Sequence, residues 1–102
     1  MQIKYSDNFA NSLDHIIDYW QNELKISDDH TKKFTTQIWK KIDLLFSFPR
    51  LGTNVTETYG FTQTTYRLTI GHRYAMFYRI NTDKDIIIIG AIASSQQLKI
   101  DF

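Results

Sequence analysis

Cysteine is missing from this 102-residue chain, which excludes disulfides and thiolate metal sites. Long apolar runs are missing too. The longest, from Ile86 to Ile89 and on through Gly90 to Ala93, is far too short to span a bilayer. The N-terminal stretch MQIKYSDNFANSLDHIIDYW is interrupted by acids and amides, unlike a signal peptide. We therefore expect a cytoplasmic protein without a membrane segment.

A large excess of charge of either sign is also absent, since the formal net charge is +1. The positive charge is nevertheless unevenly placed. All four arginines, Arg50, Arg67, Arg73 and Arg79, lie between positions 50 and 79, where the only acid is Glu57. Local positive charge attracts phosphates or acidic partners within the screening length of about 10 Å, even when the total charge is near zero.

What the sequence does contain is enough apolar surface for one core. Apolar residues make up 42% of the chain and aromatic residues 15%, which argues against disorder. The length suits a single domain over residues 1–102. The four glycines are too far apart for a phosphate-cradling loop, and His15, His30 and His72 lack a metal-ligand spacing. We therefore expect no metal and no cofactor.

The first segment of the chain predicts a strand followed by an amphipathic helix. Residues 2–5 alternate polar and apolar side chains, as a strand does. Between residues 9 and 24 the apolar side chains recur at steps of three and four, the period of a helix with one buried face. Ser6 or Asp7 is the expected N-cap, because a short oxygen-bearing side chain accepts a hydrogen bond from a free backbone amide.

A second helix follows the turn at Ser27-Asp28-Asp29 and ends before Pro49, since the residue before a proline is pushed away from helical geometry. The short polar turn predicts that the two helices pack as an antiparallel hairpin. The apolar residues of the second helix are expected to face the core: Phe34, Ile38, Ile42 and Leu45 in one stripe, widened by Trp39, Leu44 and Phe46.

The second half of the chain predicts three strands, over residues 61–70, 73–81 and 85–93, joined by tight turns into an antiparallel meander. The last strand, IIIIGAIA, is apolar on both faces and is expected to lie centrally, covered on both sides, or to pair with the first strand. The predicted fold class is α+β, in the order β-α-α-β-β-β, with the N-terminal helical hairpin packed on a mainly antiparallel sheet of about four strands. The tail from Ser94 is left open between a short helix, a frayed end and a segment that docks on a partner.

This order of elements resembles the RelE/ParE superfamily, the toxins of bacterial type II toxin–antitoxin pairs. Four segments, in matching order, carry the resemblance over most of the chain: Ile3-Lys4-Tyr5-Ser6 with Phe9 and Leu13, Phe48-Pro49-Arg50-Leu51-Gly52, Tyr66-Arg67-Leu68, and Tyr74 to Ile80 followed by Ile86 to Ile92. The long helical hairpin and the Pro-Arg-Leu-Gly turn are more similar to ParE than to RelE.

The resemblance implies one of two modes of action. One branch of the superfamily cuts messenger RNA on the ribosome without a metal, and the other poisons DNA gyrase. Cleavage of RNA by its 2′-hydroxyl requires a base, an acid and cationic groups around one phosphate. A gyrase poison requires only a binding surface. A third hypothesis is a degenerate, non-toxic member that only binds an antitoxin.

Four residues are the candidate catalytic groups if the chain is a ribonuclease: Arg67, Arg73, His72 and Tyr74. Arg67 ranks first, because a strand arginine presents a planar fork of donors to a phosphate. The alternative for Arg67 is a surface salt bridge, for example with Glu57. His72 and Arg73 are expected to flank Arg67 across the hairpin. If the chain binds its target without chemistry, the expected target-binding residues are Arg67, Arg73 and Arg50.

The chain also departs from the catalytic branch of the superfamily. Ala75 stands where that branch usually has an arginine, and Ala93-Ser94-Ser95-Gln96 replaces the His, Arg or Tyr that often closes the last strand. These departures slightly favour the gyrase poison. The resemblance further implies a cognate antitoxin, which would wrap a helical or extended segment over apolar and basic surface and form a toxin–antitoxin hetero-oligomer. Either gyrase or the ribosome with its mRNA would be the target.

Overall fold

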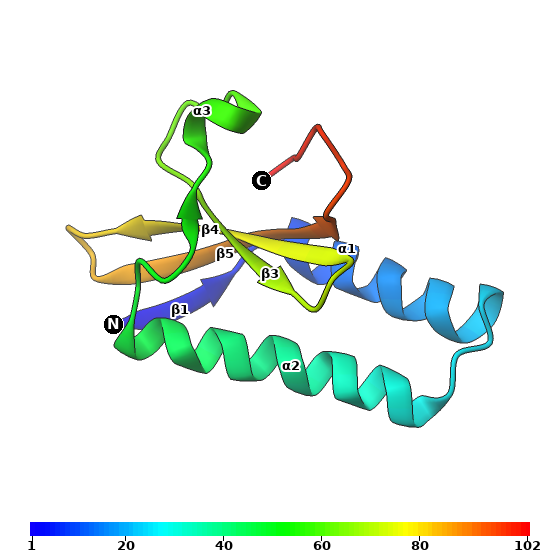
Figure 1. Ribbon diagram of the computed structural model, residues 1–102. Helices are drawn as coiled ribbons and strands as arrows, with labels where there is room; N and C mark the ends of the chain where they lie inside the picture. Colours follow the sequence, from blue (N-terminus) through cyan, green and yellow to red (C-terminus); the bar gives the residue numbers. More distant parts are fainter.

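The computed structural model describes all residues from 1 to 102 and has the predicted α+β order (Figure 1). The elements are β1 (Gln2–Tyr5), α1 (Asp7–Asp18), a π-helical turn η1 (Tyr19–Glu23), α2 (Asp28–Ser47), β2 (Thr53–Asn54), α3 (Thr56–Tyr59), β3 (Tyr66–Ile70), β4 (Tyr74–Asn81) and β5 (Ile86–Ser94). The sheet has five strands because β2, two residues long, joins the four that were expected. No helix combines the length and apolar character needed to cross a membrane.

Serine side chains begin both long helices. Of the two caps considered for α1, Ser6 fills the role: its Oγ accepts the Phe9 N–H at 3.0 Å. The same hydroxyl donates to the Gly90 carbonyl at 2.8 Å, which ties the start of α1 to β5. Ser27 Oγ accepts the His30 N–H at the start of α2. As predicted, α2 ends just before Pro49.

The strands lie in the order β1-β5-β4-β3-β2. β1 runs parallel to β5, with Gln2 opposite Ile86, and all other pairs are antiparallel. The apolar run of β5 is explained by this order, because β5 lies between β1 and β4 and is covered on both faces. The two alternatives expected for the last strand, a central covered position and pairing with the first strand, both hold in the structure.

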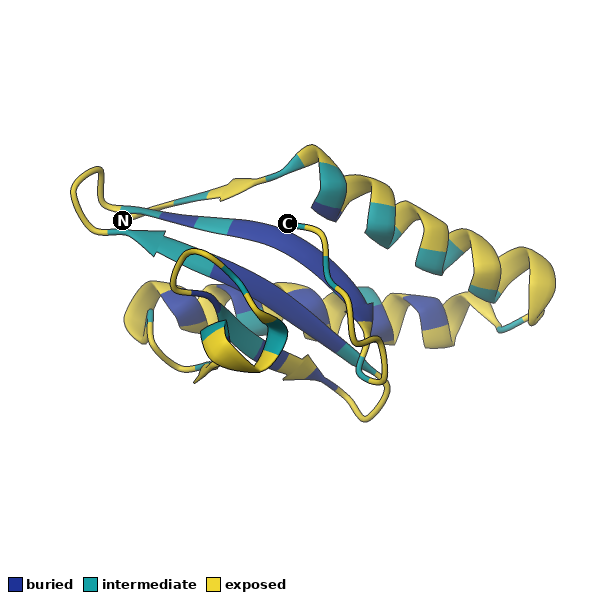
Figure 2. Cartoon of the chain, turned by 90° about the horizontal axis from the view of Figure 1, so that it is seen from above, coloured by how far each residue is buried: buried dark blue, intermediate teal, exposed yellow.

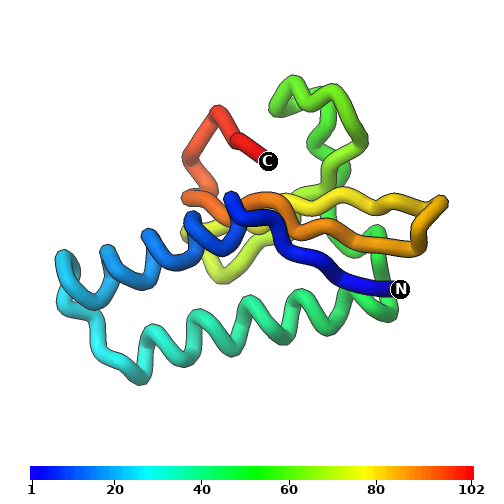
Figure 3. Tube along the Cα trace, turned by 180° about the vertical axis from the view of Figure 1, so that it is seen from behind, coloured from blue at the N-terminus to red at the C-terminus, as the bar shows by residue number.

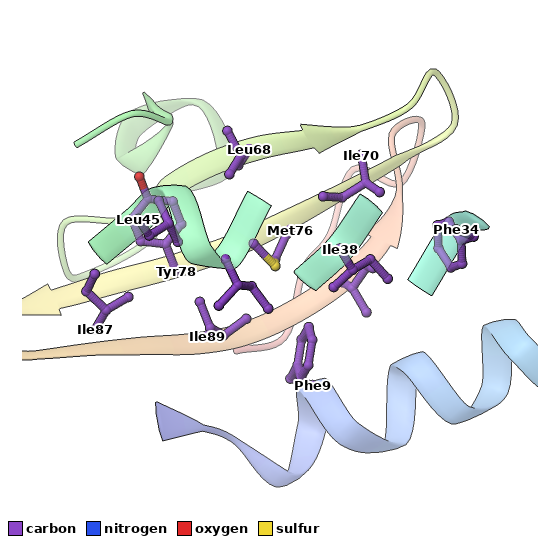
Figure 4. Packing of buried hydrophobic residues seen from close by; sticks show 12 residues of the cluster. Phe9, Phe34, Ile38, Leu45, Leu68, Ile70, Met76, Tyr78, Ile87 and Ile89 are labelled. Atoms are coloured by element: carbon purple, nitrogen blue, oxygen red, sulfur yellow. The ribbon is translucent and has the colours of Figure 1, made fainter. Parts of the chain in front are cut away.

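The helical hairpin covers one face of the sheet, and the larger core lies between them (Figure 4). The predicted stripe of α2 is buried there together with side chains of all three long strands. This core cluster consists of Phe9, Phe34, Ile38, Ile42, Leu45, Leu68, Ile70, Met76, Tyr78, Ile87, Ile89 and Ile92.

The predicted widening of that stripe is wrong. Trp39, Leu44 and Phe46 are exposed, with 47%, 43% and 53% of their surface accessible. The sheet covers only one side of α2, and successive helical residues are rotated by about 100°, so these side chains point away from the sheet. Figure 2 shows the same division along the helices, with buried residues on the side that faces the strands.

A smaller core lies on the opposite face of the sheet, under α3 and the C-terminal segment 95–102 (Figure 3). Val55, Ala75, Phe77 and Ala91 form this core, and four side chains of the two covering segments pack on it: Tyr59, Phe61, Ile100 and Phe102. The sequence did not predict β2 or α3, because elements of two and four residues carry no periodic signal. The three alternatives for the tail did not include the observed arrangement, in which Ile100 and Phe102 pack on the chain's own sheet.

Candidate functional site

Arg67 is the second residue of β3 and lies on the sheet face opposite the helical hairpin. Its register partners are Phe77 in β4 and Thr53 in β2, and paired residues of antiparallel strands point to the same face. The side chain is half-buried, and its Nε has neither solvent contact nor a hydrogen-bond partner. Arg67 does not pair with Glu57; the single ion pair of the structure joins the N-terminal amine to Asp85 at 3.3 Å.

Arg79 lies on the same face and is the residue that sequence reasoning missed. It is the diagonal neighbour of Arg67, two positions beyond Phe77 in β4. Its guanidinium lies 3.8 Å from the Phe102 ring centroid and 5.4 Å from that of Phe61, and its Nε donates to Thr65 Oγ1 at 3.0 Å. Cation–π contacts of this kind stabilise a charged group that is partly buried. Burial lowers the pKa of Arg79 below the usual arginine value.

A signal for Arg79 existed in the sequence. Once the turn is recognised as the three residues Gly71-His72-Arg73, counting outward from its centre at His72 pairs Arg67 with Phe77 and Thr65 with Arg79. Both arginines then fall on one face, because side chains alternate along each strand. We name the surface formed by Arg67 and Arg79 the arginine face.

His72 and Arg73 belong to the turn between β3 and β4 and do not flank Arg67, so that expectation is wrong. Across the hairpin from Arg67 stands Phe77 instead. Both turn residues are exposed, and the Arg73 carbonyl accepts the Ser95 N–H at 2.7 Å. His72 and Arg73 are remote from Arg67 because, in the register of this hairpin, residues near the turn lie at the far end of the strands from it.

Tyr74 points to the helical face of the sheet. It pairs with Ile70, its hydroxyl accepts the Trp20 Nε1–H at 2.8 Å, and its ring centroid lies 5.2 Å from that of Phe34. Arg67 and Tyr74 are therefore on opposite faces. The four candidate catalytic residues do not converge on one point that a phosphate would occupy.

Arg50 lies in the loop between α2 and β2 and is exposed. It is three residues before Thr53, the β2 partner of Arg67, so Arg50 and Arg67 lie at the same end of the sheet. Arg73 lies beyond the other end of β3. Of the three expected target-binding residues, two are thus neighbours and one is remote.

The Pro-x-x-Gly turn has a structural reason. The Gly52 N–H donates to the buried Tyr78 hydroxyl at 2.9 Å. A Cβ on Gly52 would lie 2.8 Å from the Arg67 carbonyl oxygen and 3.0 Å from Tyr78 Oη. Desolvation raises the pKa of Tyr78 above 10.0, against the opposing effect of the Gly52 hydrogen bond. The turn therefore positions the strand that carries Arg67.

Three His, Asp or Glu side chains that would suit a metal ion do not come together anywhere in the structure. The donors around the arginine face are guanidinium and hydroxyl groups, set among aromatic rings. This chemistry suits the binding of a carboxylate, a phosphate or an aromatic surface.

Comparison with protein families matches residues 3–98 to the model of "ParE toxin of type II toxin-antitoxin system, parDE". The chain belongs to the ParE toxin family. A solved structure titled "Chromosomal ParDE TA system from P. aeruginosa" has the same fold as this ParE-family chain, with a TM-score of 0.70 over 92% of this chain and 95% of the other. At 20% identity, that likeness concerns the fold alone. No curated protein matches the sequence.

Proposed function

We propose that this ParE-family protein is a cytoplasmic toxin that inhibits bacterial growth by poisoning DNA gyrase and is neutralised by a cognate antitoxin. We favour gyrase over mRNA as the target because Arg67 and Tyr74 lie on opposite faces of the sheet. A ribonuclease needs its base, acid and cations around one phosphate. A poison that binds its target needs only a surface.

The arginine face is the proposed contact with the target. Arg67 belongs to this face, and Arg50, at the same end of the sheet, lies in the loop with the exposed Phe48 and Leu51. Planar, weakly hydrated guanidinium groups next to apolar side chains are typical of protein–protein contact surfaces. The aromatic rings around Arg79 provide no group that would act as a general base.

The proposed antitoxin site lies on another part of the molecule. Tyr5, Trp39 and Phe46 are about half exposed, at 46%, 47% and 53%. The rings of Tyr5 and Trp39 meet edge to face with centroids 5.9 Å apart, and Phe46 follows Trp39 by two helical turns. β1 is an edge strand of the sheet. An amphipathic helix on these side chains, or a strand added to β1, would cover this surface.

Two measurements together test the proposed target. A short pulse of expression, with labelled precursors of DNA, RNA and protein, is expected to arrest DNA synthesis first. The purified protein is expected to inhibit supercoiling by gyrase or to trap cleaved DNA. First arrest of protein synthesis, with ribosome-dependent cleavage of mRNA, would instead establish the ribonuclease. Arrest of neither, with soluble protein present, would leave a non-toxic antitoxin-binding module.

A further inference from the structure

A basic groove of about 550 Å³ runs between the N-terminal half of α2 and the turn that joins β3 to β4. Figure 1 shows this turn lying over α2. The Gln37 side chain reaches toward Gly71, so the two walls are close neighbours. The proposed toxin function uses neither wall.

Both walls carry positive charge, and no acid lines the groove. On α2, His30, Lys33, Gln37 and Lys40 follow one another at steps of three, four and three, which places them in one row along the helix. The row is about 15 Å long at 1.5 Å per residue. Arg73 adds charge from the opposite wall. The formal charges of the row are those of Lys33 and Lys40, with the uncharged Gln37 between them, and an extended anion complements these two lysines together with Arg73.

Aromatic side chains form the floor. Trp20 and Tyr74 are half-buried, joined by a hydrogen bond of 2.8 Å, and both pack on Phe34. A second hollow of about 560 Å³ continues past Trp20 and Tyr74 toward Tyr19 and Leu24 at the tip of the hairpin. Cations beside accessible aromatic rings are the combination that binds a single nucleic-acid strand, because phosphates meet the cations while bases stack on rings.

We infer that this groove binds single-stranded nucleic acid through its phosphodiester backbone. The alternative occupant, an acidic segment of a protein partner, fits less well. Two exposed apolar side chains of α2, Trp39 and Phe46, lie on a different side of the helix and do not line the groove. The exposed Tyr19 and Leu24 line only the adjoining hollow. Single-stranded nucleic acid offers repeated phosphates to Lys33, Lys40 and Arg73 and needs only a few rings for stacking.

The test uses the purified protein and fluorescein-labelled oligo-dT and oligo-U of about twelve nucleotides, followed by anisotropy at several salt concentrations. Lys33→Glu with Lys40→Glu is the groove variant. Lys84→Glu with Lys99→Glu is the matched control, since both lysines are exposed, lie outside the groove and change the net charge equally. Circular dichroism and thermal unfolding establish that both variants are folded.

The groove variant is expected to bind about tenfold more weakly or worse, while the control changes by less than about threefold. The slope of log K against log salt should fall by about 1.4 in the groove variant, because each phosphate contact on a single strand contributes about 0.7. Comparison of the two oligonucleotides identifies the preferred sugar. In a Trp39→Phe background, Trp20 is the only tryptophan, and its fluorescence should change on binding.

Four outcomes would overturn the assignment: no binding at low salt, equal losses in the groove variant and the control, unchanged Trp20 fluorescence during binding, or tighter binding of a duplex. Displacement by polyglutamate at equal charge would overturn it too, in favour of an acidic peptide. The assay contains neither gyrase nor antitoxin, so a negative result leaves the proposed function standing.

Discussion

Gly52 shows how one residue of a family-like motif acts through its surroundings. Pro49 ends α2, and the chain then passes so close to β3 and Tyr78 that only a residue without a side chain fits. The backbone N–H of Gly52 also satisfies the buried Tyr78 hydroxyl. The motif therefore joins the end of the helix to the strand that bears Arg67.

Substitution of Gly52 by alanine is expected to lower the free energy of unfolding by about 1–3 kcal/mol, because the added Cβ meets the Arg67 carbonyl at 2.8 Å. Urea denaturation followed by circular dichroism measures the change. Thr53→Ala, at the next and exposed position, is the control and should change stability much less. Equal stability of Gly52→Ala and the original protein would contradict the steric account.

Tyr78 predicts a dependence of stability on alkaline pH. Burial raises its pKa in the folded state above 10.0, so the unfolded chain releases this proton at lower pH than the folded chain does. The folded state then holds more protons than the unfolded state. Stability is therefore expected to be complete below about pH 10 and to fall as pH rises through the folded pKa.

Tyr78→Phe is expected to cost about 1 kcal/mol at neutral pH, because the Gly52 N–H loses its acceptor, and to reduce the alkaline loss of stability. Denaturant midpoints at several pH values between neutral and strongly alkaline measure both effects. Burial also raises the pKa of Tyr5, but that side chain is 46% exposed, so Tyr5→Phe should change the profile less. Parallel profiles for Tyr78→Phe and the original protein would remove Tyr78 as the cause.

At the scale of the element, α2 is a helix with three different sides. One side buries Phe34 and Ile38 against the sheet, a second carries the exposed Trp39 and Phe46, and a third carries Lys33 and Lys40 of the groove. Only the first contributes much to folding, because it removes large apolar side chains from water. The other two are available for partners.

Neighbouring substitutions on α2 separate folding from binding. Ile38→Ala is expected to lower the free energy of unfolding by about 2–5 kcal/mol, since Ile38 is fully buried and its loss leaves a cavity. Trp39→Ala should change stability much less and weaken the complex with the antitoxin. Thermal unfolding and isothermal titration with the co-encoded antitoxin provide the two readouts. Full antitoxin affinity in Trp39→Ala would place the antitoxin site elsewhere.

At the scale of the whole molecule, the sheet separates two chemically different faces. The helical face carries the large core and Tyr74, whereas the opposite face carries Arg67 and Arg79 under α3 and the C-terminal segment. A bulge at Gly90 shapes the second face, because Phe77 pairs with Ala91 while Tyr78 pairs with Ile89. The Phe102 ring packs directly on this glycine.

Gly90→Ala is expected to displace the C-terminal segment, because a Cβ there would collide with the Phe102 ring. The ring is the end of a side chain that can move, so the loss of stability should stay near 1 kcal/mol. Hydrogen exchange of residues 97–102 measures the displacement. The control is Phe102→Ala, which should raise exchange in the same residues; unchanged exchange in Gly90→Ala would show that the ring is not held there in solution.

The two faces also give a test for function. Arg67→Ala is expected to abolish growth arrest, because it removes the central cation of the arginine face, whereas Tyr74→Phe should keep toxicity, since its hydroxyl faces Trp20 rather than Arg67. Growth after induction, with both variants checked for expression, is the measurement. Loss of toxicity in folded Tyr74→Phe would favour a catalytic role for that hydroxyl, and full toxicity of Arg67→Ala would remove it from the site.

The signals that predicted the fold correctly were local ones. The helix starts were placed at Ser6 or Asp7 and at the Ser27-Asp28-Asp29 turn, and the end of the second helix at Pro49, from neighbours only a few residues away. Arg67 was singled out by family resemblance, but its relation to Arg79 was missed. That relation depends on which residues face each other across a hairpin, and a shift of one position would reverse the face of every side chain.

The sequence by itself determined the order of the longer helices and strands and the buried stripe of α2, because periodicity and caps depend on short stretches of chain. The resemblance of four segments indicated the family. Only the tertiary structure decided which groups meet. The register of β3 with β4 put Arg67 and Tyr74 on opposite faces. The sheet covered one side of α2, which left Trp39 exposed despite its place in an apolar pattern. Which residues share a face is settled by contacts between segments far apart in the chain, and no local pattern records them.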